Sequence, residues 1–126
     1  MLTELWASND VLTNHYATSV HHAGHLYGFH GRQEFGQSFR AVELSTGKVR
    51  WNQDRFLAGT VTLAGDRLVI LRERGELVLA PASPEAFKPI ARAQILPGTV
   101  RAYPALSDGH LFARNENTLI ALDLRK

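Results

Sequence analysis

The sequence predicts an all-β fold, built from about three repeated units of four short antiparallel strands. Apolar residues recur in short alternating or continuous runs, and almost nowhere with the period of an amphipathic helix. Nearly every run ends at Gly, Asp, Asn, Ser or Pro, which are the residues of tight turns. One hairpin pattern also returns three times along the 126 residues. Together these observations indicate consecutive small β-sheets.

Each expected strand is a run with a turn residue at its end. In chain order the runs are Ala17 to His21, Leu26 to His30, Phe39 to Leu44, Val49 to Asn52, Thr60 to Ala64, Leu68 to Leu71, Glu76 to Ala80, Ile90 to Leu96, Ala102 to Leu106, His110 to Arg114 and Leu119 to Leu124, with a twelfth at Glu4 to Ala7. Only the segment from Ser83 to Phe87 looks helical, because Ser caps, Pro suits the first helical position and Glu favours the positive end of the dipole. We expect a helical turn or two there.

The repeated hairpins place a small or acidic residue and a glycine before an apolar strand. They occur at Ala23-Gly24, Ala64-Gly65-Asp66 and Asp108-Gly109, with glycines 41 and then 44 residues apart. A period of roughly 40–45 residues that holds four antiparallel strands is typical of a β-propeller blade. We therefore expect one partial β-propeller over residues 1–126, with units at about 1–55, 56–97 and 98–126.

A sharper motif closes the first unit. Residues 41–51 read Ala-Val-Glu-Leu-Ser-Thr-Gly-Lys-Val-Arg-Trp, with key positions Ala41, Glu43, Thr46, Gly47 and Trp51. The segment resembles the Ala-x-Asp-x-x-Thr-Gly-x-x-x-Trp motif of PQQ-like, quinoprotein-type propeller repeats, with Glu43 in place of Asp. The resemblance implies that the Thr-Gly turn joins the third and fourth strands of a blade, and that the Trp packs between neighbouring blades.

Parts of this motif recur elsewhere. Ala121 and Asp123 occupy the Ala and Asp positions of a last unit, and Trp6 looks like the outgoing Trp of a preceding one. The second unit, Leu77 to Pro81, has lost Thr-Gly and Trp. The resemblance therefore points to the C-terminal blades of such a propeller.

Composition excludes several classes of protein. The formal charge is only +2, from 14 basic and 12 acidic side chains scattered along the chain, so we expect no nucleic-acid partner. There is no cysteine, no apolar run long enough for a membrane span, and no signal-peptide pattern at the N-terminus. The compartment stays open, although PQQ-like proteins are often periplasmic.

No residue stands out as catalytic or cofactor-binding. The resemblance implies PQQ and calcium only if the chain is part of a larger dehydrogenase, whose site is built from many blades. His21, His22 and His25 are the candidate metal ligands, but consecutive strand residues point to opposite faces, and we expect no metal site. The charged stretch from Arg72 to Glu76 reads as an exposed hairpin, with an acid–base or anion site as the other interpretation.

We therefore expect a non-catalytic propeller segment that acts as a binding or assembly scaffold, similar to the propeller lipoproteins that help assemble outer-membrane β-barrels. The alternatives are the C-terminal part of a PQQ-dependent dehydrogenase, and a carbohydrate-binding propeller. A ring normally needs about 4–8 blades. The expected partners are therefore the remaining blades of a larger propeller or a second copy of the chain. In the second case, Glu4 to Ala7 of one copy would complete the last sheet of the other.

Overall fold

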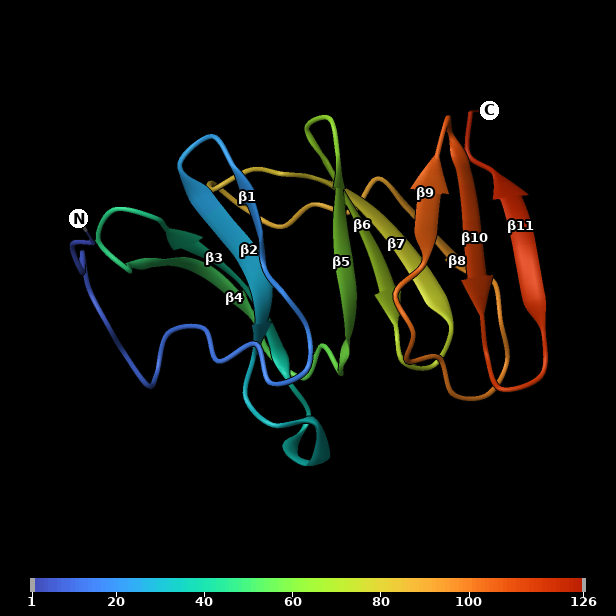
Figure 1. The fold of residues 1–126 in the computed structure, drawn as a ribbon, viewed down its shortest axis with the longest axis horizontal. Coiled ribbons are helices and arrows are strands. Elements are labelled where there is room, and N and C mark those ends of the chain that lie inside the picture. The colour runs from blue at the N-terminus through green and yellow to red at the C-terminus, as the bar shows by residue number, and fades with distance from the viewer. Residues whose placement is uncertain (1, 126) are drawn as a thin grey trace.

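Three antiparallel β-sheets follow one another along the molecule, in the order of the sequence (Figure 1). The computed structural model describes residues 2–125. The first sheet holds β1 (Val20–His22), β2 (His25–His30), β3 (Ser38–Glu43) and β4 (Val49–Gln53) in spatial order. The second holds β5 (Gly59–Ala64), β6 (Arg67–Arg72), β7 (Glu76–Pro81) and β8 (Ala91–Gln94). The third holds β9 (Ala105–Ser107), β10 (His110–Arg114) and β11 (Leu119–Asp123). No helix within these residues is long and apolar enough to cross a membrane.

The strand registers reveal equivalent positions in the three sheets. The first hairpin of each sheet turns through two residues, so Gly24, Asp66 and Gly109 are equivalent, 42 and then 43 residues apart. The glycines alone give an uneven spacing because Gly65, with φ +62, stands one position earlier in its turn than Gly24 and Gly109. The same registers make Tyr27, Val69 and Phe112 equivalent. The repeat predicted from the sequence is thus a structural repeat.

Apolar side chains fill both spaces between the sheets. We call the face of each sheet that carries Tyr27, Val69 or Phe112 its front face, and the opposite one its back face. The front face of the first sheet packs on the back face of the second through Tyr27, Phe29, Phe39, Ala41, Val61, Leu68, Ile70 and Val78. The front face of the second sheet packs on the third through Val69, Leu71, Leu77, Leu111 and Ala113. The central strand β6 of the middle sheet is therefore buried on both faces, which explains the unbroken apolar run Leu68 to Leu71, whereas the edge strand β8 is exposed.

The N-terminal segment covers the back face of the first sheet. The Arg40 guanidinium on β3 donates hydrogen bonds to the carbonyl oxygens of Asp10 and Val11, at 2.9 and 3.0 Å. Gly28 on β2 lies so close to Ser19 that a Cβ atom there would clash with the Ser19 hydroxyl oxygen. Val42, which points to this face, is 0% exposed. The first sheet is thereby shielded on both faces.

Eleven of the expected strands are present, and the twelfth prediction is wrong. Residues Glu4 to Ala7 form no strand, because no neighbouring strand within residues 2–125 pairs with them. The helical turn expected from Ser83 to Phe87 is also wrong. Ser83 instead makes a local turn with Glu85, its hydroxyl donating to Glu85 Oε2 at 2.7 Å, and Phe87 packs against the core between the first two sheets. The only helical element described is a 3₁₀ turn, Gln33–Phe35, in the β2–β3 connection.

Candidate functional site

The turn after β3 holds the motif residues Glu43, Thr46 and Gly47. The Gly47 amide donates to the Glu43 carbonyl oxygen at 2.9 Å, and the Glu43 carboxylate accepts the Thr46 hydroxyl at 2.9 Å. This hydrogen bond lowers the pKa of Glu43. At the equivalent position in the third sheet, the Asp123 carboxylate accepts the guanidinium and the backbone amide of Arg125, which lowers the Asp123 pKa to about 2. A carboxylate at this position therefore bonds to residues that follow its strand in both sheets.

Trp51 lies on β4 at the join between the first two sheets. Its indole Nε1 donates to the Ser83 carbonyl oxygen at 2.8 Å, in the connection that follows β7. Its ring centroid is 5.7 Å from that of Phe39 and 5.3 Å from that of Phe87. The side chain is half-buried and contacts both sheets.

Trp6 repeats this arrangement on the first sheet. Its Nε1 donates to the Leu44 carbonyl oxygen at 2.7 Å, and its ring lies directly over Gly47. A Cβ atom on Gly47 would be 3.0 Å from two indole carbons. Trp6 is half-buried against the motif turn. Residues 4–7, which include it, pair with no strand of the described chain.

The register also locates the tryptophan that the second unit has lost. Ala41, Leu79 and Ala121 are equivalent, and the residue opposite Ala41 on the next strand is Trp51. The residue opposite Leu79 is Ala91, which is exposed. The join between the second and third sheets therefore has an alanine where the preceding join has an indole.

The three candidate histidines lie on the first hairpin and are partly or fully exposed. His22 and His25 are directly opposite each other on β1 and β2, and so share a face, whereas His21 points to the other face. His21 Nε2 accepts the Gly24 amide at 3.2 Å, and His25 Nδ1 lies 3.2 Å from the Ala23 carbonyl oxygen. Within residues 2–125, no group of three or more His, Cys, Asp or Glu side chains is placed to hold a metal ion.

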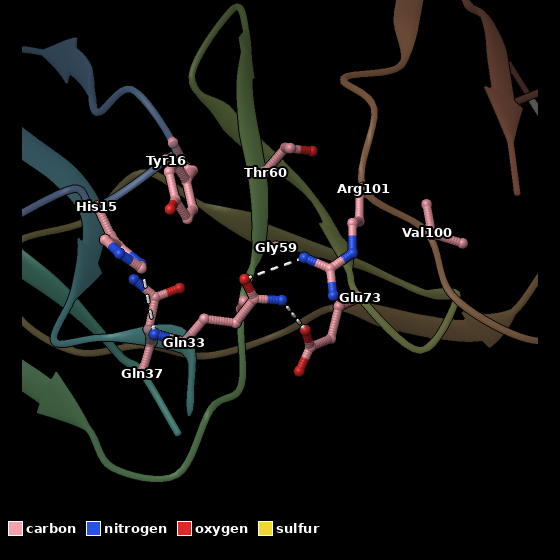
Figure 2. Close-up of a pocket in the computed structure, with 11 residues that line it drawn as sticks. His15, Tyr16, Gln33, Gln37, Gly59, Thr60, Glu73, Val100 and Arg101 are labelled. Atoms are coloured by element: carbon pink, nitrogen blue, oxygen red, sulfur yellow. Dashed lines mark hydrogen bonds between the residues drawn. The ribbon is translucent and has the colours of Figure 1, made fainter. Parts of the chain in front are cut away.

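A cavity of about 180 Å³ lies where loops from all three sheets meet (Figure 2). Its wall comes from the segment before β1, the β2–β3 connection, the start of β5, the β6–β7 turn and the connection to β9. The lining residues are His15, Tyr16, Ala17, Gln33, Gln37, Ala58, Gly59, Thr60, Glu73, Val100 and Arg101. The cavity is thus built by the connections and not by the apolar faces of the sheets.

Gln33 links the three sheets across this cavity. Its side-chain Nε2 donates to Glu73 Oε2 at 2.7 Å, and its Oε1 accepts from the Arg101 guanidinium at 3.1 Å. Figure 2 shows Gln33 between Arg101 on one side and His15 and Tyr16 on the other. A neutral amide therefore joins one cation and one carboxylate, and the lining has both donors and acceptors facing a solvent-accessible space.

The backbone around the cavity is strained. Six described non-glycine residues have positive φ, and two of them, Ala23 and Asp108, belong to the repeated hairpin turns. The other four are Asn14, His15, Arg55 and Leu57, in the two segments that lead to β1 and β5, and of these His15 lines the cavity. Positive φ costs roughly 1–2 kcal/mol for such residues, and strain of this kind gathers at functional sites.

Among these residues, only Glu73 belongs to a stretch that the sequence singles out, the charged run from Arg72 to Glu76, which was interpreted as an exposed hairpin. Gln33, Arg101 and His15 gave no signal, because they lie 18 to 86 residues apart and belong to no common motif. The donor set does not suit calcium and a quinone cofactor, since the only carboxylate in the wall is Glu73 and calcium needs several oxygen ligands. We therefore derive no quinone chemistry from these residues.

Comparisons with known proteins bear on the fold. No protein-family model matches the sequence, and no curated protein matches it. Among solved structures, the chain is similar to BamB from Moraxella catarrhalis, with a TM-score of 0.68 and 13% sequence identity over 87% of this chain. The alignment covers 34% of BamB, so the chain spans about a third of that protein's length. With its three antiparallel sheets, this chain has the fold of a partial β-propeller.

Proposed function

We propose that this chain is a PQQ-like propeller segment that acts as an assembly scaffold, and that the front face of its third sheet binds a second copy of the chain. The observation that carries the proposal is a difference between equivalent residues. Tyr27 and Val69 are 0% and 4% exposed because the next sheet covers them, whereas Phe112 is 40% exposed. Leu119 and Ala121 are exposed on the same face, so the third sheet presents a blade interface that no described residue covers.

A second copy fits this surface because its N-terminal side presents what the third sheet lacks. The third sheet ends at β11, whose outer edge pairs with no strand of the described chain. Residues 4–7 of another copy pair with no strand, and Trp6 among them contacts Leu44 and Gly47 much as Trp51 contacts the second sheet. Pairing of these residues with β11 would complete a fourth strand. The front face of each third sheet would then meet the N-terminal segment that covers the other copy's first sheet. Two such contacts between different surfaces allow a closed ring of six blades.

The repeat type rests on the motif turn. Glu43, Thr46 and Gly47 make the hydrogen bonds of one compact turn, and a tryptophan packs on it from outside the sheet. These contacts support the PQQ-like interpretation of residues 41–51. The fold similarity to BamB supports the propeller itself.

Light scattering on the purified protein tests the assembly. We expect a dimer, and we expect the double variant Phe112→Ser with Leu119→Ser to be monomeric, because it makes the exposed face polar. The matched control is Ile90→Ser, which changes an exposed apolar residue outside the third sheet. A cooperatively unfolding monomer of the native protein would overturn the proposal, as would a double variant that associates like the native chain. Large aggregates would instead indicate that further blades of a longer propeller cover this face.

A further inference from the structure

The cavity around Gln33 is small, and its size limits what it can bind. Its volume of about 180 Å³ is below the roughly 300–1,000 Å³ typical of pockets for drug-sized ligands. It is therefore suited to a ligand of about one six-membered ring. Because all lining residues belong to one chain, this space exists whether or not a second copy binds the third sheet.

The charges of the wall favour a neutral ligand. Arg101 is the one cationic side chain and Glu73 the one carboxylate, and Gln33 is hydrogen-bonded to both. A phosphate or carboxylate would be repelled by the Glu73 carboxylate, and an ammonium group would be repelled by the Arg101 guanidinium. Repulsion from a like charge therefore weakens the binding of either kind of ion. A hydroxyl group can accept from the guanidinium and donate to the carboxylate, so neighbouring hydroxyls on one ring match this pair.

An aromatic wall supplies the apolar contact. Tyr16 is 81% exposed although it is a large ring, and its centroid is 4.1 Å from that of His15. His15 has a positive φ of 43°, so the backbone is held in an unfavourable conformation where it positions both rings. The C–H face of a sugar ring packs well on such an exposed aromatic surface.

We infer that this cavity is a binding site for a neutral sugar ring, with Tyr16 as the aromatic platform and with Arg101 and Glu73 bonding the ring hydroxyls. Gln33 is a positioning residue that holds Arg101 and Glu73 apart by its two hydrogen bonds. This inference is independent of the scaffold proposal, because it uses none of the residues of the third sheet's front face.

Saturation-transfer NMR tests the site, with the methyl glycosides of glucose, galactose and mannose as probes. We expect transfer to at least one glycoside, and we expect Tyr16→Ala and Glu73→Gln each to weaken its affinity about tenfold or more. The matched controls are Phe35→Ala, which removes an equally exposed ring outside the cavity, and Arg74→Ala, next to Glu73 but outside the wall. Both controls should bind like the native protein, and all four variants should keep its thermal midpoint.

Two results would overturn the inference. One is the absence of transfer to all three glycosides, and the other is unchanged binding in either Tyr16→Ala or Glu73→Gln.

Acetate, inorganic phosphate and glycine serve as charged probes in the same samples. Transfer to one of these in preference to the glycosides would show that the cavity selects charge, and would reject a neutral ligand. Light scattering on the same samples reports assembly separately, so failure of one proposal is distinguishable from failure of the other.

Discussion

The indole of Trp51 reaches from the last strand of the first sheet to the backbone of Ser83 in the second, where its Nε1 donates a 2.8 Å hydrogen bond to the carbonyl oxygen. The ring also lies against Phe39 and Phe87, which come from different sheets. One side chain therefore connects two sheets by both apolar and polar contacts.

We expect Trp51→Ala to lower the free energy of unfolding by roughly 3–5 kcal/mol, because it leaves a cavity among aromatic rings and frees the Ser83 carbonyl. Trp51→Phe keeps much of the apolar contact and should cost less. Urea unfolding followed by circular dichroism measures both changes. A Trp51→Ala variant that unfolds like the native protein would contradict the role of this residue as a link between sheets.

The second prediction concerns the contact between Trp6 and Gly47. Gly47→Ala places a residue at φ +77 and brings its Cβ to 3.0 Å from the indole. Gly24→Ala is the matched control, since it has a similar φ of +82 and nothing within 4 Å of the added atom. Both changes cost roughly 1–2 kcal/mol of backbone strain, and Gly47→Ala should cost about 1 kcal/mol more. The added loss should vanish when Trp6 is also replaced by Ala, as a double-mutant cycle by urea unfolding would measure.

Tyr27 gives a prediction of pH dependence. Burial, with a smaller contribution from the charge of Glu85, raises the pKa of its phenol from 10.0 to about 12. Between these two pH values the unfolded chain releases the proton and the folded chain keeps it, so this group lowers stability as the pH rises. We expect Tyr27→Phe to lose stability less steeply than the native protein over this interval. At neutral pH the variant should be as stable as the native protein or slightly more so, since the buried hydroxyl has no partner. Equal pH profiles from denaturant titrations would contradict this.

Arg72 gives the fourth prediction. Its Nε donates to the Phe56 carbonyl oxygen at 2.8 Å, its guanidinium lies 4.8 Å above the Phe56 ring centroid, and it pairs with Glu76. Arg72→Ala removes all three contacts at a half-buried position, so we expect a loss of about 2 kcal/mol. Arg92→Ala is the control, because Arg92 contacts the same carboxylate but is more exposed, and should cost less than about 1 kcal/mol. Thermal unfolding compares the two, and equal losses would contradict a special role for Arg72.

The β-strands were predictable because their signals are local. Turn residues such as Gly24 and Gly109 punctuate apolar runs, and both properties can be read within a few residues. Glu4 to Ala7 has the same local pattern, yet pairing needs a neighbouring strand that the local sequence does not supply. The helical signals around Ser83 were outweighed by the burial of Phe87 against the first sheet. Local propensity fails in both places because tertiary contacts decide the structure.

The candidate site was largely invisible for a similar reason. Gln33, Glu73 and Arg101 meet only after three sheets have packed side by side, and none of them belongs to a recognisable motif. The histidines at positions 21, 22 and 25 attracted attention because they are adjacent in sequence. The register of β1 and β2 puts His22 and His25 on one face and His21 on the other, so the three histidines do not share one face.

The burial of the central strand of the middle sheet on both faces determines how the molecule should unfold. Amide protons in the centre of β6, at Val69 and Ile70, lie between neighbouring strands and beneath both outer sheets, and should exchange with solvent only by global unfolding. The amides of β11 pair with β10 on one side only, and should exchange by local fraying. Neither outer sheet can detach without exposing an apolar face of the middle sheet. All strands except the edge strands should therefore unfold as a single cooperative unit. A proteolytic cut between two sheets should not release a stable blade.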